Sequence, residues 1–331
     1  MKKERINWID IYKGFLIVLV VIGHVISSYE GAGVSNSLYK ALFSIIYSFH
    51  MACFVFISGF LCNIKNNTSK AKQIKKRMIT YGIPYIIFSF IWIVFKMVFS
   101  KYVNTTVGVI DLINIFIIPV SFMWYLYALL LMNIVQIIIE KSNSRIVIIL
   151  SITALLLKPI IVAYFPGFKD LIICDFMSFW FYFVLGHYYG QFIINIMTSK
   201  KWLIIISVLL FVTTNCLLQM PLQLFKSYIS IASALSGIVL LVAFFKKIKR
   251  CEILNYLGNK SLSIYVLQGI VIAATRVLLG KISIYNDSLG IVNLIICTIS
   301  GIIIPLAIEK VCSKMWKFDF IFYPNKYIKE E

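Results

Sequence analysis

The sequence has few charged residues, and acidic ones are especially scarce. Only 14% of the 331 residues are Asp, Glu, Lys or Arg, and Asp and Glu together number 13. Because soluble globular domains average about a quarter charged residues, this shortage argues against an ordinary soluble protein. The apolar share agrees, with 61% hydrophobic residues and a mean hydropathy of +0.92. We therefore expect an integral membrane protein.

Several kinds of motif are also missing. The seven cysteines have neither the spacing of a disulfide framework nor that of a zinc site, so we expect buried thiols and no bound metal. No segment alternates like the strands of a barrel, and no repeat of about 20 to 50 residues occurs. No Pro-rich or Ser-rich linker divides the chain, which predicts one domain over residues 1–331. The first apolar run is too long for a signal peptide, so the first helix is expected to stay attached.

Apolar runs of about 20 residues recur along the chain, and each is long enough to cross some 30 Å of hydrocarbon as a helix. They predict an all-α, polytopic membrane bundle of about ten transmembrane helices. The expected spans are Ile11–Tyr29, Leu38–Ile64, Ile79–Phe99, Phe122–Ile139, Ile146–Tyr164, Phe176–Ile196, Trp202–Leu218, Tyr228–Phe245, Leu262–Leu279 and Leu289–Ile308. The apolar piece DLINIFIIPV (111–120) is too short to span and is expected to be re-entrant or interfacial. The stretch from Lys65 to Arg77 is expected to be a polar cytoplasmic connection.

The basic residues predict the orientation of these helices. Lys and Arg crowd into alternate connections, beginning with Lys2, Lys3 and Arg5, whereas the connections between them carry one Lys each. Since positive residues collect on the cytoplasmic side, both termini are expected to be cytoplasmic. The +19 formal charge is then mostly a topology signal that also attracts anionic lipid. Its spread over separate loops argues against a nucleic-acid partner.

The first apolar run carries two ionisable residues, Lys13 and His24. An ionisable residue inside a membrane span is costly and is a candidate for a functional site. Eleven residues make about three helical turns, so both side chains project from one face, about 16 Å apart along the axis. Asp10 can pair with Lys13 from that face. The alternatives are a snorkelling Lys13 and a His24 that only joins two helices.

The stretch RINWIDIYKGFLIVLVVIGH, from Arg5 to His24, resembles the opening of the membrane acyltransferase-3 family, particularly its small polysaccharide and sugar O-acetyltransferases. That family has an Arg or Lys, ten intervening residues and a His, a spacing that Lys13 and His24 fit. Further resemblances follow in order: FHMACFVFISGF (49–60), KKRMITYGIPY (75–85), MWYLYALL (123–130), FYFVLGHYYG (181–190) and LGNKSLSIYVLQ (257–268). Two positions depart from the family. The family often has Arg at the position of Lys13. Many members have His at the position of Gln268, where glutamine can still form hydrogen bonds.

The resemblance implies a membrane O-acyltransferase that moves an acyl group, usually acetyl, from cytoplasmic acyl-CoA to a hydroxyl at the outer face. The expected acceptor is a cell-surface polysaccharide or its lipid-linked precursor, and the expected location is the cytoplasmic membrane of a bacterium. Acetyl-CoA is expected as a co-substrate, with no permanently bound cofactor. Glycan-assembly proteins are candidate partners. The acceptor sugar, the acyl chain length and the oligomeric state stay open.

Within that reaction, His24 is expected to be the general base that deprotonates the acceptor hydroxyl, because imidazole titrates near neutral pH. A transient acyl-histidine is the alternative. His50 is expected to polarise a carbonyl, unless it only joins helices. Ser58 and Gly59 are expected to allow close helix packing rather than to supply a nucleophile, since no G-x-S-x-G turn is present. His187 is expected to be structural.

Four charged or aromatic residues are candidates for contacting the substrates, and each of them also has an alternative role in membrane topology or at the membrane interface. Lys13 and Arg77 are candidates for binding the phosphates or carbonyls of the donor, with a topology charge as the alternative for Arg77. Trp124 is a candidate for lining the acceptor cavity, and an interfacial aromatic residue is its alternative. Arg276 is a candidate for binding an anionic acceptor, and snorkelling is its alternative.

Two other functions remain as alternatives. Ten helices with a few buried charges also describe a secondary transporter of a small polar solute or glycan precursor. The same fold also suits a non-enzymatic binding or export component. A carrier has no evident need for the spacing of Lys13 and His24, so the sequence favours the enzyme.

Overall fold

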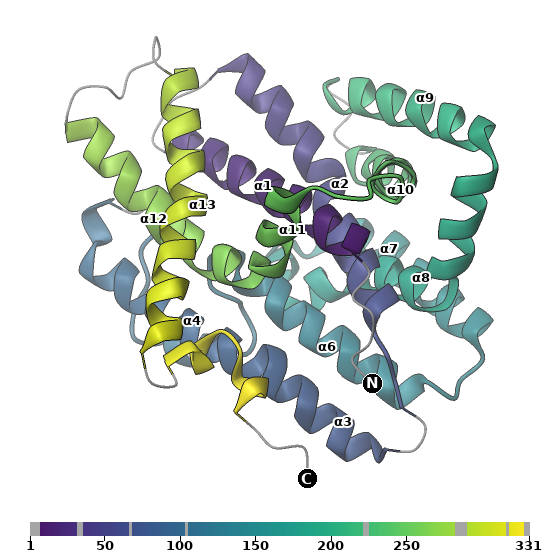
Figure 1. Cartoon of the computed structure of the whole chain (residues 1–331), viewed down its shortest axis with the longest axis horizontal. Helices are drawn as coiled ribbons and strands as arrows, with labels where there is room; N and C mark the ends of the chain where they lie inside the picture. Colours follow the sequence, from purple (N-terminus) through teal and green to yellow (C-terminus); the bar gives the residue numbers. More distant parts are fainter. Residues whose placement is uncertain are drawn as a thin grey trace. The chain divides into compact units, whose positions relative to one another are not determined.

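The computed structural model describes residues 7–31, 36–65, 68–102, 105–220, 225–281, 290–315 and 318–327, without the side chains of residues 197–199 and 201. Every regular element in these ranges is helical and none is a strand, which confirms the all-α prediction (Figure 1). Arg5, at the start of the predicted family motif, and Leu289, the predicted start of the last span, lie outside the described residues.

Eight helices among the described residues are long and apolar enough to cross a membrane. They are α1 (Asn7–Glu30), α2 (Ser37–Leu61), the continuous segment Lys70–Val98, the segment Ser121–Ile139, α7 (Ser144–Tyr164), α10 (Lys226–Phe245), α12 (Ser261–Lys281) and α13 (Gly290–Lys314). The two other predicted spans are helical as α8 (Ile172–Ser199) and α9 (Lys201–Leu218). The chain is therefore an all-α polytopic membrane bundle. The total of ten spans and the cytoplasmic termini stay predictions.

The polar stretch predicted as a connection from Lys65 to Arg77 is helical in its second half. Helix α3 (Lys70–Arg77) begins where the Ser69 hydroxyl accepts a hydrogen bond from the Lys72 amide at 3.3 Å. A π-helical turn, Met78–Gly82, then continues α3 into α4 (Ile83–Val98). The prediction of a loop was wrong here because Ala, Lys, Gln and Arg are polar or small yet form helices well once a serine caps the first turn.

Two short helices complete the description. The apolar piece 111–120 forms only α5 (Asp111–Asn114) followed by turns, which is too short to span. Helix α11 (Glu252–Asn259) was not predicted, because eight residues are too few for a clear periodic signal.

The chain divides into two compact units. Unit 1 contains Met1–Phe54, Tyr102–Asn104 and Ile193–Val311, and unit 2 contains Val55–Lys101, Thr105–Phe192 and Cys312–Glu331. In unit 1, α1 packs against α10, α11 and α12, and α9 packs against α10 (Figure 1). In unit 2, α3 and the π-helical turn pack against α6 (Trp124–Ile139). The single domain over residues 1–331 stays a prediction.

Helices α1 and α11 touch through two glycines. A Cβ atom on Gly14 would lie 1.9 Å from the carbonyl oxygen of Leu254, and one on Gly258 would lie 1.8 Å from that of Asp10. Small residues let membrane helices approach this closely, because no side chain separates the two backbones. The contact fixes α11 against the part of α1 that carries Lys13.

Unit 2 shows the same kind of packing at Gly59. A Cβ atom there would lie 2.0 Å from the carbonyl oxygen of Phe183, which confirms the predicted packing role of Gly59. His187 Nε2 lies 3.1 Å from Glu140 Oε2, an ion pair or hydrogen bond that fits its predicted structural role.

A buried ion pair joins the start of α12 to α13 in unit 1. Lys260 Nζ lies 2.6 Å from Glu309 Oε1, and the Glu309 side chain is only 2% exposed. The sequence interpretation counted Lys260 among the topology charges. Its partner lies 49 residues away, so no local pattern of residues indicated the pair.

Candidate functional site

Lys13 lies in the first half of α1 and binds Asp10 one turn earlier. The distance from Lys13 Nζ to Asp10 Oδ1 is 3.1 Å, which confirms the predicted pair. The Asp10 side chain is 7% exposed and that of Lys13 is 25% exposed, so the ammonium group keeps access to its surroundings. His24 follows eleven residues later in the same uninterrupted helix, so the separation of about 16 Å along the axis holds.

The structure brings His24 and His50 together in unit 1, from α1 and α2. The two imidazoles interact electrostatically. His24 is partly accessible, whereas His50 is only 2% exposed. The Tyr47 ring meets the His50 ring edge-on, with 4.9 Å between their centroids. Two neighbouring imidazoles can accept, hold and pass a proton.

A backbone hydrogen bond determines which nitrogen of His50 carries hydrogen. His50 Nδ1 lies 2.6 Å from the carbonyl oxygen of Ile46. A carbonyl oxygen only accepts, so Nδ1 donates, and in the neutral ring Nε2 holds a lone pair. Neutral His50 therefore accepts at Nε2 and has no second donor. The predicted role of polarising a carbonyl would require a doubly protonated ring.

Helices α1, α12 and α13 contact one another along the second half of α1. Arg276 Nη1 donates to the carbonyl oxygen of Ser28 at 2.5 Å, which ties α12 to the last turns of α1. A Cβ atom on Gly301 of α13 would lie 3.0 Å from Val21 and 3.2 Å from Ile272. Arg276 therefore has a structural role in joining α12 to α1. Binding of an acceptor by Arg276 stays a prediction.

Gln268 lies one turn before Ile272 in α12, and its side chain is buried. Its side chain is 0% exposed, and neither Nε2 nor Oε1 is paired among the described residues. A buried polar group left without a partner costs about 1–3 kcal/mol. The sequence interpretation kept a hydrogen-bonding role for this residue, but only the structure shows that the amide is buried and unpaired.

Arg77 and Trp124 belong to unit 2. Arg77, the last residue of α3, donates Nη2 to the carbonyl oxygen of Asn63 at 3.2 Å. Trp124, the first residue of α6, stacks on Phe179, with 5.0 Å between ring centroids and 19° between planes. Their predicted contacts with donor and acceptor stay predictions.

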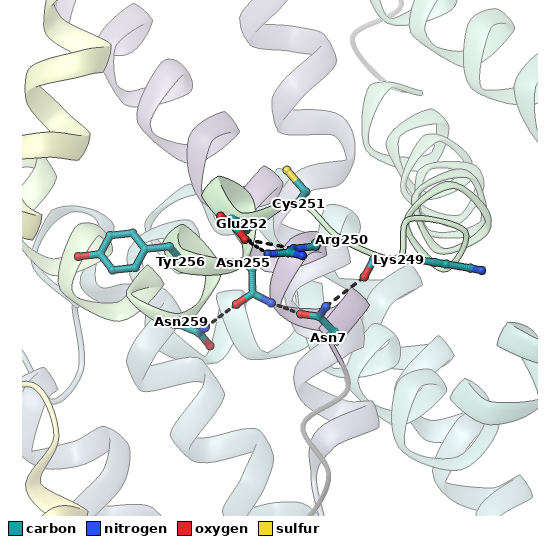
Figure 2. Close-up of a pocket in the computed structure, with 8 residues that line it drawn as sticks. All are labelled: Asn7, Lys249, Arg250, Cys251, Glu252, Asn255, Tyr256 and Asn259. Carbon is teal, nitrogen blue, oxygen red and sulfur yellow. Dashed lines mark hydrogen bonds and ion pairs between the residues drawn. The ribbon is translucent and has the colours of Figure 1, made fainter.

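A pocket of about 360 Å³ opens in unit 1 beside the first turn of α1 (Figure 2). It is lined by Asn7, Lys249, Arg250, Cys251, Glu252, Asn255, Tyr256 and Asn259. Asn259 donates to Asn255 at 2.9 Å, Asn255 donates to Asn7, and Asn7 donates to the Lys249 carbonyl at 3.1 Å. Figure 2 shows this amide chain beside the paired Arg250 and Glu252. The sequence interpretation missed the pocket, because its basic residues were read only as topology charges.

Asn7 lies about 9 Å before Lys13 along the α1 axis, so the pocket and Lys13 belong to the same end of α1. The described residues contain no group of three or more His, Cys, Asp or Glu side chains that could hold a metal ion. Unit 1 thus contains a polar pocket, a lysine, a buried amide without a partner among the described residues, and two histidines, which are contributed by α1, α2, α11, α12 and the segment before α11.

Comparison with known proteins adds an independent observation. The sequence model of the acyltransferase-3 family, described as an acyltransferase domain, matches residues 6–310. Nodulation protein NolL of Sinorhizobium fredii is 30% identical to the chain over 123 residues. That stretch covers 37% of this chain and 33% of NolL, so the match extends over about a third of that relative. No solved structure matches the chain.

Proposed function

Because the chain belongs to the acyltransferase-3 family, we propose that this membrane acyltransferase moves acetyl from cytoplasmic acetyl-CoA to a glycan hydroxyl. The proposed acceptor is a surface polysaccharide or its lipid-linked precursor, at the cytoplasmic membrane of a bacterium. The observation that carries the proposal is that His24, on the helix that also carries Lys13, lies close enough to His50 of α2 for the two imidazoles to interact electrostatically.

The reaction needs one proton to be moved from the acceptor. The hydroxyl oxygen attacks the thioester carbonyl carbon, an ester C–O bond forms and the C–S bond breaks. CoA leaves as a thiol, which takes up the proton that the hydroxyl gives away. We assign His24 as the general base, because it is partly accessible whereas His50 is buried. A positioned base contributes about 10²- to 10⁴-fold to the rate.

His50 has a different part in this proposal from the one expected from the sequence. Its Nδ1–H is held by Ile46, so its neutral ring offers only the Nε2 lone pair. We propose that this lone pair accepts a hydrogen bond from the sugar and so orients the hydroxyl toward His24.

The donor is proposed to enter at the end of α1 that carries Lys13. The pocket beside Asn7 adjoins that end, and its lining includes Lys249 as well as the Arg250–Glu252 ion pair, so it carries one net positive charge, which suits the phosphates of CoA. The long pantetheine arm then leads from Lys13 toward His24. Arg77 stays a second candidate for the donor.

The acceptor is proposed to approach from the opposite end. Trp124 and Arg276 stay candidates for binding it, and glycan-assembly proteins stay candidate partners that deliver it. The acetyl group itself is part of the proposal, because membership of the family supports acyl transfer without fixing the acyl chain.

The proposal is tested with membranes that contain the chain, labelled acetyl-CoA and surface glycans of the producing cell. Label is expected in a base-labile ester, and membranes without the chain should lack it. Lys13→Ala is expected to raise the KM for acetyl-CoA, and Lys13→Arg, which keeps the charge, should raise it less. Absence of labelled ester despite intact protein and acceptor would overturn the proposal.

A further inference from the structure

We propose that Gln268 binds the acyl donor, with its side-chain amide pairing with amide groups of the pantetheine arm. The inference rests on the proposed function and adds to it a recognition residue and the part of the donor that it recognises. No bond forms or breaks at Gln268, which acts by binding.

The first observation is the unpaired amide itself. Gln268 is fully buried in α12, and both of its side-chain polar atoms lack a partner among the described residues. Buried polar groups in native proteins almost always have a hydrogen-bond partner, either protein, water or ligand. An amide with both its donor and its acceptor side unpaired can bind a molecule that offers both an acceptor and a donor.

The second observation is the direction and register of α12 against α1. Gly258, just before α12, touches the first half of α1 at Asp10, and Arg276 near the end of α12 reaches Ser28. The two helices therefore run in the same direction. Gly301 meets both Ile272 and Val21, which places these two residues at about one level.

Gln268 then lies between the two ends of the proposed donor path. It precedes Ile272 by one turn, about 6 Å, and so lies about 6 Å below the level of Val21. Lys13 lies about 12 Å below Val21, and His24 about 4.5 Å above it. The amide is thus about 6 Å beyond the level of Lys13 and about 10 Å before that of His24, so an arm that enters near Lys13 and ends near His24 crosses its level.

The hydrogen-bonding groups of the Gln268 amide indicate which part of the donor it binds. Nε2 donates and Oε1 accepts, so a phosphate, which only accepts when ionised, would leave Oε1 unpaired. The pantetheine arm carries secondary amides, whose carbonyl groups accept and whose N–H groups donate. Neutral histidine also offers one donor and one acceptor, which fits the resemblance noted for this position.

Gln268→Met tests the inference, because methionine has a similar size but no hydrogen-bonding amide. We expect the KM for acetyl-CoA to rise about 10- to 100-fold for the loss of two hydrogen bonds, with little change in kcat or in the KM of the acceptor. Gln268→His is expected to keep the donor KM within several-fold of wild type. CoA should also raise the melting temperature of wild type more than that of Gln268→Met.

Thermal stability separates binding from a structural role. Gln268→Met should melt no lower than wild type, because it removes an unpaired buried amide. The control is Gln136→Met in α6, where the amide donates to Tyr188 at 2.8 Å and to Glu140 at 3.0 Å, and this variant should melt lower.

Three results would overturn the inference while leaving the proposed function in place. A lower melting temperature for Gln268→Met with an unchanged donor KM would mean a structural amide. If Gln268→Met changes neither the melting temperature nor the KM for acetyl-CoA, a buried water completes the hydrogen bonds of the amide. A raised KM for the acceptor alone would assign Gln268 to the sugar. If wild type transfers no label, the proposed function fails, and the CoA-induced shift still tests donor binding.

Discussion

Replacing Gly14 by Ala is expected to force α1 and α11 apart. The added Cβ would lie 1.9 Å from the carbonyl oxygen of Leu254, and ordinary contact begins near 3.4 Å. The backbones must therefore separate by about 1.5 Å. Backbone of a neighbouring helix cannot turn aside as a flexible side chain can, so the full displacement falls on the packing of α11.

The expected cost follows from two opposing effects. Overpacking a close contact costs about 1–3 kcal/mol, and Ala gains about 1 kcal/mol over Gly inside a helix. A net loss of up to about 2 kcal/mol is expected for Gly14→Ala. Gly280 in α12 is the matched control, because nothing lies within 4 Å of a Cβ placed there. Gly280→Ala should be neutral or slightly stabilising.

Tryptophan fluorescence during heating of the detergent-solubilised protein measures the difference. Gly14→Ala should unfold at a lower temperature than both wild type and Gly280→Ala. Since Gly14 adjoins Lys13, the displacement should also raise the KM for acetyl-CoA. Equal melting temperatures for the two glycine variants would refute the close contact between α1 and α11.

Two further predictions concern charges outside the proposed site. Lys260→Met leaves the buried carboxylate of Glu309 without its ion-pair partner, so it should cost about 3–5 kcal/mol in thermal unfolding. Glu309→Gln should cost less, because the Lys260 side chain is 27% exposed. The reverse order would contradict the deeper burial of Glu309. Hydrogen bonds from Lys326 and Tyr327 lower the pKa of Asp319. Its contribution to stability is therefore complete above the ordinary pKa of 3.8 and is lost as pH falls through the lowered value. The melting temperature of Asp319→Asn should fall less steeply with decreasing pH than that of wild type. Parallel curves for the two proteins would contradict the stabilising contacts of Asp319.

The long helices could be predicted well because their signal is local. Membrane-crossing helices require about 20 apolar residues in succession, and that run is visible in one stretch of sequence. The span predicted as Ile11–Tyr29 is α1, Asn7–Glu30, and the span predicted as Leu262–Leu279 is α12, Ser261–Lys281. Polar and short helices lack this signal, which explains why α3 and α11 were missed.

In the candidate site, too, only the features that depend on local sequence could be predicted. The pairing of Asp10 with Lys13 follows from helical geometry alone, since residues three apart are neighbours on one face. The unpaired amide of Gln268 and the pocket beside Asn7 depend on contacts between segments far apart in the chain. The hydrogen bond that leaves Nε2 of His50 as an acceptor is local, yet the sequence alone does not say which carbonyl the ring will face.

The central claim is that His24 moves the proton in an acyl transfer reaction. Its most direct test compares His24→Ala with His187→Ala for labelled ester formed from acetyl-CoA, at equal amounts of membrane protein. The account predicts a loss of at least about 10²-fold for His24→Ala and nearly wild-type transfer for His187→Ala, which removes a histidine bound to Glu140 in unit 2. Wild-type transfer by His24→Ala would contradict the account.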